Sequence, residues 1–390
     1  MKTQAAGIEQ PAADKVSPRA AYIHVPFCLH RCGYCNFTLV ARRDDLIDAY
    51  LEAIEREISA LELPRPVDTL FFGGGTPTHL PPAALERLLT IVRRWFPPQP
   101  GYEFSVEANP ADLDAQRVAV LAAGGVTRIS LGAQSFDPGK LALLERDHRA
   151  EQIAAAVALV RPHIRSLSLD LIFGTPGETL ELWQCDLEMA LALEPDHLST
   201  YGLTFERGTA FWARLQRGEL RRQDEEHEGA MYAAAIDRLT AAGFEHYEVS
   251  NFARTGQRCR HNEAYWAGDE YYAAGPGAAR YVDGRREVNH RSTTTYIQRV
   301  LAGRSPVAES ETLSGEDRAR EGLVIGLRRI GGVERAEFAR RFGHEIDALV
   351  GPELQRFVAQ GLFDDTGAAL RLTRAGLLIS DALWPAFLRA

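Results

Sequence analysis

The chain has 390 residues, and its 44 Lys and Arg against 53 Asp and Glu give a formal net charge of −9. Hydrophobic residues make up 45% and charged residues 25%, a balance typical of a folded protein rather than a disordered one. No apolar run reaches the roughly 18 residues of a membrane span, so we expect no intrinsic membrane anchor. The acidic balance argues against nucleic acid as the main partner.

The cysteines indicate the compartment and the chemistry. There are five, and three of them lie within eight residues. An odd, clustered set argues against a disulfide framework and favours metal or redox chemistry in a reducing compartment. The first 18 residues lack the apolar core of a secretory signal and are expected to form a flexible lead-in. We therefore expect a cytoplasmic protein.

Apolar, β-rich stretches alternate with helical patterns from residue 20 onward. The predicted strands are Ala20–Phe27, Asp68–Phe72, Tyr102–Ala108, Arg128–Gln134, Leu167–Phe173 and His197–Thr204. The predicted helices between them are Asp44–Leu63, Pro82–Phe96, Ala111–Ala123, Ala150–Val160 and Thr179–Leu193. Single helices between strands indicate parallel βαβ units. Six such units predict an α/β fold, a partial TIM-like (β/α)6 barrel.

The pattern changes near residue 253. A long helix, Asp224–Ala242, and a β-like stretch, Phe244–Phe252, are predicted to close the alternation. Ala267–Asp283 is rich in Gly, Tyr and Ala and is predicted to be an irregular, packed loop region. Residues 312–390 indicate short helices and a hairpin-like turn. We divide the chain into a flexible segment (1–18), a barrel (19–253) and a mostly helical, winged-helix-like C-terminal domain (254–390).

The strongest chemical signal is Cys28-Leu-His-Arg-Cys32-Gly-Tyr-Cys35, at the end of the first predicted strand. Thiolates are soft ligands that suit iron–sulfur clusters and zinc. Three of them on one short loop can hold three corners of a cubane and leave the fourth iron without a protein ligand. Two alternatives are three buried thiols or a structural zinc, which needs four ligands. His30 lies awkwardly inside the loop for that fourth role.

A glycine-rich segment, Phe72-Gly-Gly-Gly-Thr-Pro77, follows the second predicted strand. Glycines let the backbone approach a ligand closely and adopt positive φ. The same letters could form a plain turn, or a phosphate-binding loop that lacks its lysine.

The cysteine spacing, preceded by Tyr22-Ile-His-Val-Pro-Phe-Cys28, resembles the radical S-adenosylmethionine (SAM) enzymes. The resemblance implies that a [4Fe–4S] cluster is held by Cys28, Cys32 and Cys35. It further implies that the open iron binds the methionine part of SAM, with Tyr22 in the cofactor site. The glycine-rich segment resembles the family's contact with the methionine amino group. The positions carried over there are Gly74, Gly75 and Thr76.

Four further polar residues match family positions that hold SAM: Glu107, Gln134, Arg146 and Asp170. Each one alone could be a strand-end cap or a surface ion pair. We place them at the ends of successive strands, where a barrel meets its ligands, and that shared placement favours a cofactor site.

The segment His261-Asn-Glu-Ala-Tyr-Trp266 resembles the HNxxYW stretch of HemW-type heme chaperones. Imidazole is a common axial ligand of heme iron, and Tyr265 and Trp266 could pack on a porphyrin face. The alternative for His261 is a hydrogen-bonded packing residue. Cys259 and Cys185 are interpreted as small buried hydrophobic residues. Arg285, Arg286 and Arg291 could meet heme propionates or be solvated.

The resemblance extends over nearly the whole chain and leaves two activities to separate. Oxygen-independent coproporphyrinogen III oxidases carry a fourth cysteine two positions after the third, where this chain has Phe37, and a longer N-terminal extension. Both differences favour a heme chaperone that binds heme and transfers it to target proteins. The implied partners are heme, those target proteins and an electron donor for the cluster. Radical decarboxylation in porphyrin biosynthesis is the alternative, and a radical enzyme with another substrate is a third.

Overall fold

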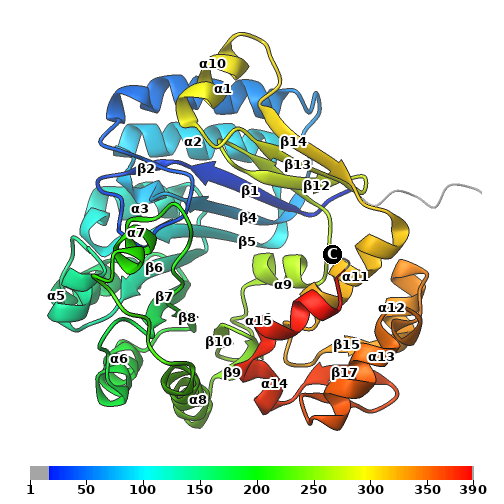
Figure 1. Cartoon of the computed structure of the whole chain (residues 1–390). Helices are drawn as coiled ribbons and strands as arrows, with labels where there is room; N and C mark the ends of the chain where they lie inside the picture. Colours follow the sequence, from blue (N-terminus) through cyan, green and yellow to red (C-terminus); the bar gives the residue numbers. More distant parts are fainter. Residues whose placement is uncertain (1–16, 389–390) are drawn as a thin grey trace, which may run out of the picture.

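The computed structural model describes residues 17–388, and a 12-stranded sheet organises the chain (Figure 1). The strand order is β14-β13-β12-β11-β1-β4-β5-β6-β7-β8-β10-β9. The central parallel strands are β1 (Ala20–Val25), β4 (Val67–Gly74), β5 (Pro98–Ala108), β6 (Arg128–Gln134), β7 (Ser166–Phe173) and β8 (His197–Gly202). These six strands lie where the sequence predicts them, and the predicted α/β barrel core is confirmed.

The helices between these strands cover the outer face of the sheet (Figure 1). They are α1 (Ile47–Ser59), α2 (Pro82–Trp95), α3 (Ala115–Ala123), α4 (Pro138–Leu143), α5 (Ala150–Val160), α6 (Leu180–Ala192) and, after β8, α7 (Ala210–Gln216) and α8 (Glu225–Ala241). The short α4 and α7 are additions to the predicted set. Asp224, where the long helix is predicted to begin, caps α8 by accepting a hydrogen bond from the His227 backbone N–H.

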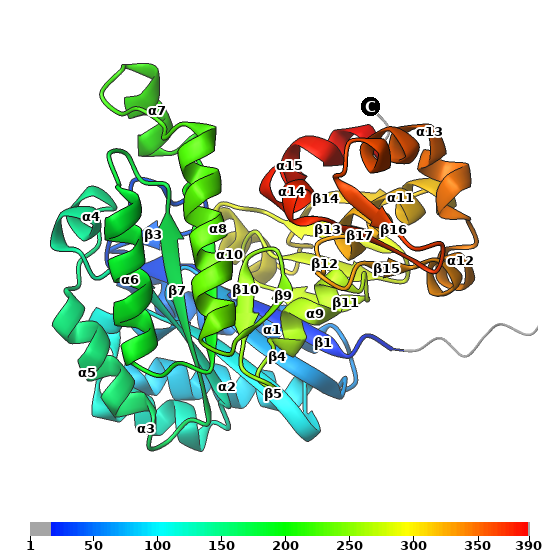
Figure 2. The ribbon, with the colours of Figure 1, turned by 90° about the horizontal axis from the view of Figure 1, so that it is seen from below.

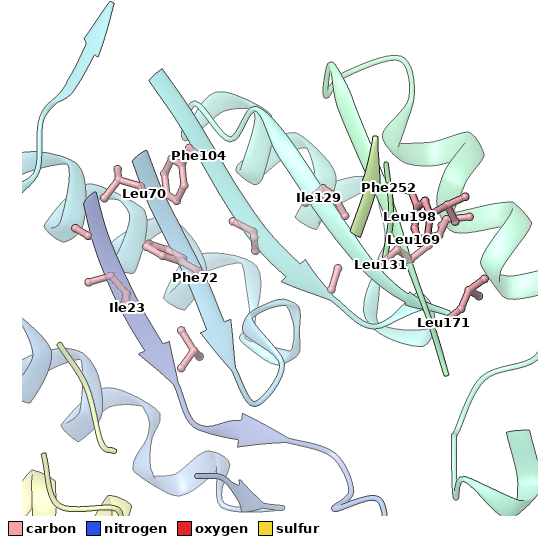
Figure 3. Packing of buried hydrophobic residues seen from close by; sticks show 14 of the residues in the cluster. Ile23, Leu70, Phe72, Phe104, Ile129, Leu131, Leu169, Leu171, Leu198 and Phe252 are labelled. Atoms are coloured by element: carbon pink, nitrogen blue, oxygen red, sulfur yellow. The ribbon is translucent and has the colours of Figure 1, made fainter. Parts of the chain in front are cut away.

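Strand alternation divides the sheet residues into two sets. Ile23, Leu70 and Leu169 belong to the buried core between the sheet and its helices, as Figure 3 shows. Because successive side chains of a strand point to opposite faces, the residues next to them lie on the inner face of the barrel. Tyr22 and Asp170 are two of these inner residues. The sequence thus places its polar candidates on the concave side.

The sheet continues beyond β8 and beyond β1. β9 (Glu245–Glu248) and β10 (Asn251–Ala253) add antiparallel strands next to β8. On the other edge β11 (Tyr271–Ala274) pairs parallel with β1, and antiparallel strands follow: β12 (Ala279–Val282), β13 (Arg285–Asn289) and β14 (Val307–Thr312). The prediction that 267–283 is an irregular loop was wrong in part, because β11 and β12 occupy eight of its 17 residues.

The last part of the chain is mostly helical with a small sheet. Its elements are α9 (Arg260–Trp266), α10 (Thr293–Leu301), α11 (Gly315–Gly326), α12 (Arg335–Phe342), α13 (Ile346–Ala359), α14 (Arg374–Leu378) and α15 (Ser380–Leu383), with β15 (Val333–Glu334), β16 (Phe363–Asp365) and β17 (Ala369–Leu372) in a three-stranded antiparallel sheet. Figure 2 shows α11 to α15 gathered on one side, beside β11–β14.

Two predictions about how the chain is divided stay predictions. The flexible lead-in, residues 1–18, lies almost wholly outside the described residues, which begin at residue 17. The division at residue 253 stays a prediction, and the 12-stranded sheet runs across it. No helix of the described part of the chain is long and apolar enough to cross a membrane.

Candidate cofactor and ligand site

The cysteine loop leaves the carboxyl end of β1 and is held by its neighbours. Its first residue belongs to β2 (Phe27–Cys28), which pairs with β3 (Val40–Ala41). The Cys28 Sγ atom lies 3.2 Å from the Thr76 Oγ1 atom. The guanidinium of Arg146 points its Nη1 atom at the Cys32 Sγ atom at 3.6 Å. The loop therefore meets two of the predicted SAM residues directly.

The donor set of this loop fits an iron–sulfur cluster. All three thiols are free of disulfides, with Cys28 buried and Cys32 and Cys35 partly exposed. Burial raises the pKa of the Cys28 thiol to about 12 and raises that of Cys35, so metal binding must displace protons from them. Within residues 17–388, no three His, Cys, Asp or Glu side chains already converge as around a single metal ion.

The glycine-rich segment ends β4 and lies against the base of the cysteine loop. The backbone N–H groups of Gly75 and Thr76 donate to the carbonyls of Val25 and Phe27. Gly74 has a φ of +109°, and a Cβ atom there would lie 2.3 Å from the His24 ring. Glycine is required at this position for both reasons.

The acidic candidates lie on the inner face. Glu107, near the end of β5, accepts a hydrogen bond from the Gly74 N–H at 3.0 Å. Asp170 accepts from the Ser130 hydroxyl. Gln134 ends β6 with a φ of +62°. The prediction that Arg146 lies at the end of a strand was wrong, because it follows α4. Its guanidinium donates a hydrogen bond to the Gly132 carbonyl at 3.2 Å.

Glu107 gives this site a pH dependence. Burial, reinforced by the negative charge of Asp170, raises the pKa of Glu107 from 4.5 to about 7. Such a group stabilises the fold below its unfolded pKa, and that contribution is lost as the pH rises through its folded pKa. We expect Glu107→Gln to gain stability over the wild type as the pH goes from about 5 to about 8. Urea unfolding at both pH values measures this, and a difference that shrinks with pH contradicts it.

The predicted heme histidine is enclosed inside the barrel. His261 is the second residue of α9, which packs on the inner face of β4, and it is 1% exposed. Its Nδ1 atom is hydrogen-bonded to the Thr69 hydroxyl at 2.9 Å, and its Nε2 atom to the Tyr265 hydroxyl at 2.9 Å. Burial lowers the pKa of His261 to about 3, so the ring is neutral. Both ring nitrogens therefore have partners within the chain.

Stacked rings connect this histidine with the first strand. The Phe71 ring stacks on His261 with centroids 5.1 Å apart and on Tyr22 at 6.1 Å. The Tyr22 hydroxyl is hydrogen-bonded to the His24 Nδ1 atom, and the His24 Nε2 atom to the Thr38 carbonyl just after the cysteine loop. One continuous set of contacts thus joins the cysteine loop to the HNEAYW helix.

A cavity of about 340 Å³ opens beside these rings. Tyr22 and Phe37 line it on the side of β1 and the cysteine loop, and Tyr265, Tyr271 and Arg291 line it on the side of the C-terminal segments. A larger cavity of about 440 Å³ lies between Leu203–Glu206 and the start of α8, and none of the predicted site residues lines it.

Known proteins match this sequence over most of the chain. The model of the Radical SAM superfamily matches residues 22–189, and that of the HemN C-terminal domain matches residues 313–379. The heme chaperone HemW of Bacillus subtilis is 34% identical over 375 residues, which are 95% of this chain and 99% of that protein. The chain belongs to the HemW family.

Two further matches extend this result. HemW of Mycobacterium tuberculosis is 38% identical over 94% of both chains. The solved structure of coproporphyrinogen III oxidase (HemN) from Escherichia coli matches with a TM-score of 0.84 over 95% of this chain and 90% of that one. At 24% identity, this second likeness shows the fold.

Several contacts of this HemW-family site were absent from the sequence prediction. Thr69 and Phe71, which hold His261, carry no motif of their own. Glu103 accepts the backbone N–H groups of Arg260 and His261 and so caps α9. Strand alternation could have placed Thr69, Phe71 and Glu103 on the inner face, but not against α9.

The two remaining cysteines differ from each other. Cys259 is buried as predicted, with its Sγ atom 3.5 Å from the Glu103 Oε1 atom. The prediction that Cys185 is buried was wrong, because it lies on the exposed side of α6. Neither of them reaches the cysteine loop in the HemW-family fold.

Proposed function

We propose that this chain is a cytoplasmic heme chaperone, which binds heme and passes it to target proteins. It would carry a [4Fe–4S] cluster and SAM, and it would take electrons for the cluster from a separate donor. HemW relatives that match nearly the full length support this function. The cysteine loop and the inner-face carboxylates support the cofactors.

The observation that carries the proposal is the place of the smaller cavity. It lies between the cysteine loop and α9, so that Tyr22 of the proposed SAM site and Tyr265 of the HNEAYW segment line the same space. A flat, mostly apolar ligand in a largely aromatic cavity is stabilised by ring contacts and burial.

Each proposed cofactor has its own residues. Cys28, Cys32 and Cys35 would hold the cluster, while Arg146 and Thr76 hydrogen-bond their sulfur atoms. Tyr22, Gly74, Gly75, Thr76, Glu107, Gln134, Arg146 and Asp170 would hold SAM. When bound, the cluster supplies the electron for reductive cleavage of SAM. The chain itself holds the inner-face carboxylates in place and keeps the loop against β4.

His261 has two proposed roles that the structure makes distinguishable. Ligation of heme iron requires one of its hydrogen bonds to open, to Thr69 or to Tyr265. In a positioning role both hydrogen bonds of His261 stay intact. Its Nε2 atom is hydrogen-bonded to the hydroxyl of Tyr265, and Tyr265 lines the cavity. We assign His261 the positioning role in the state described here.

Heme titration of His261→Ala and Tyr265→Phe tests this assignment. Loss of a buried hydrogen bond costs about 1 to 3 kcal/mol, so we expect about ten-fold weaker heme binding in both variants. The Soret maximum should stay in place if His261 only positions, and it should shift in His261→Ala alone if His261 ligates iron. Unchanged affinity and spectrum in His261→Ala would exclude both roles.

The oxidase alternative is tested on the same reconstituted protein. With reductant, SAM and coproporphyrinogen III under anaerobic conditions, a heme chaperone yields no protoporphyrinogen. Formation of protoporphyrinogen at catalytic rates would replace the proposed function with porphyrin biosynthesis.

A further inference from the structure

The wall of the smaller cavity carries a single fixed charge. Among the described residues that line it there is no Asp or Glu, and Arg291 is its one arginine. His24 also lines the cavity, but burial lowers its pKa to about 4, so it is neutral at pH 7. In a chain with a net charge of −9, this cavity is therefore locally positive.

Arg291 differs from the arginines next to it. Arg285 pairs with Glu287 at 3.1 Å, and Arg286 pairs with Glu321 at 2.6 Å. Within residues 17–388, Arg291 has no carboxylate partner of this kind, and its side chain is exposed. An unpaired guanidinium at the edge of a cavity is suited to a carboxylate of a ligand, because its planar fork matches carboxylate geometry.

The backbone around Arg291 is fixed, so the guanidinium is presented from a rigid base. The His290 carbonyl accepts from the Gly277 N–H at 3.0 Å, and the Asn289 side chain donates to the Glu57 carboxylate at 2.6 Å. Ser292 caps α10 by accepting from the Thr295 N–H. Rigid support lowers the entropy lost when a ligand binds.

The segment just after the cysteine loop lines the cavity with one large apolar ring, Phe37, between the polar residues Asn36 and Thr38. Phe37, at the position where the oxidases have a fourth cysteine, lines the cavity and leaves 63% of its side chain exposed. A large apolar ring facing a cavity gains by burial when a flat apolar ligand covers it. The cavity thus has a cationic edge and an aromatic face.

We infer that this cavity selects a planar macrocycle bearing carboxylates, with Arg291 binding a carboxylate and Phe37 covering the ring face. The inference rests on the proposed function and assigns the orientation of heme within the site. The propionate edge lies toward β13 and α10, and the macrocycle lies toward the cysteine loop. Arg291 is then a specificity determinant, while Phe37 supplies affinity without selecting for charge.

The test compares heme with heme dimethyl ester, which lacks the carboxylates, on the full chain with its cluster reconstituted. We expect the wild type to prefer heme by about ten-fold, as one charge-assisted hydrogen-bonded pair provides. Arg291→Gln should lose most of this preference. Phe37→Ala should weaken both ligands by a similar factor. The matched controls are Arg304→Gln, an exposed arginine outside the cavity lining, and Leu63→Ala, which is 65% exposed in the connection between α1 and β4.

The outcomes separate the two proposals. Wild-type chain that binds neither ligand contradicts the proposed function. Wild-type chain that binds heme and ester equally, or Arg291→Gln that keeps the full preference, overturns the inference and leaves the chaperone function standing. If Phe37→Ala binds both ligands as tightly as the wild type, Phe37 does not cover the ring face of the macrocycle. Because both residues are exposed, the variants should fold, and circular dichroism checks this.

Discussion

We expect Cys28→Ser to leave the chain without a stable [4Fe–4S] cluster. A serine hydroxyl is a hard, weakly acidic donor and does not replace a thiolate at iron. The two remaining thiols would then hold at most two corners of the cubane. Iron and sulfide content after anaerobic reconstitution should fall from about four of each per chain to near zero. SAM cleavage should be lost with it.

A matched variant controls for the chemistry of the substitution itself. Cys185→Ser makes the same change on the exposed side of α6. This variant should reconstitute as the wild type does. Full cluster content in Cys28→Ser, or its loss in Cys185→Ser, would show that the cluster is held elsewhere than in the cysteine loop.

The strands of the barrel could be predicted because each is a short, β-rich run between two helical patterns. In β4, Leu70 and Phe72 face the helices, while Thr69 and Phe71 face inward. Such a pattern needs no knowledge of the rest of the chain. The cysteine and glycine loops follow directly from it, since they are the turns that leave the carboxyl ends of β1 and β4.

A local sequence pattern does not predict a strand whose structure depends on pairing with a distant strand. Tyr271–Ala274 has only four residues, two tyrosines that favour a strand and two alanines that do not, and it forms β11 beside β1. Ala273 and Ala274 are buried. The parallel pairing of β11 with β1 supplies the backbone hydrogen bonds of this strand. Cys185 failed for a related reason. A helix of mixed composition does not reveal which side of α6 the sheet covers.

The surroundings of His261 were beyond the reach of sequence reasoning. Its partner Thr69 is 192 positions away in the chain, and no pattern in either segment indicates the other. The motif marked His261 as a candidate heme residue, and that stays a prediction. The motif could not show that both ring nitrogens of His261 are hydrogen-bonded within the chain. These hydrogen bonds are the observation that favours a positioning role over ligation of heme iron.

The ring contacts suggest how the two proposed sites relate. Tyr22 lies in the proposed SAM site, and the Phe71 ring stacks on both Tyr22 and His261. A row of packed side chains such as this one can couple two sites when the residues at one end adopt two discrete conformations. The same contacts hold α9, which carries the HNEAYW segment, against the inner face of β4.

We expect Lys140→Ala to be the most destabilising of the changes considered. Lys140, the only lysine among the described residues, is 4% exposed. Its Nζ atom lies 2.5 Å from Glu178 and 2.9 Å from Asp186, two carboxylates that are themselves buried. Removing one member of a buried ionic group leaves uncompensated charge and costs about 3 to 5 kcal/mol. The midpoint of urea unfolding measures the loss.

Two comparisons isolate that cause. Arg238→Ala removes an exposed pair with Glu188 and should cost about 1 kcal/mol or less. Lys140→Met combined with Glu178→Gln and Asp186→Asn removes the uncompensated charges and should recover part of the stability lost in Lys140→Ala. Equal effects in Lys140→Ala and Arg238→Ala would contradict the argument. Because α4 leads directly to Arg146, the Lys140→Ala variant should also loosen the support that Arg146 gives to Cys32.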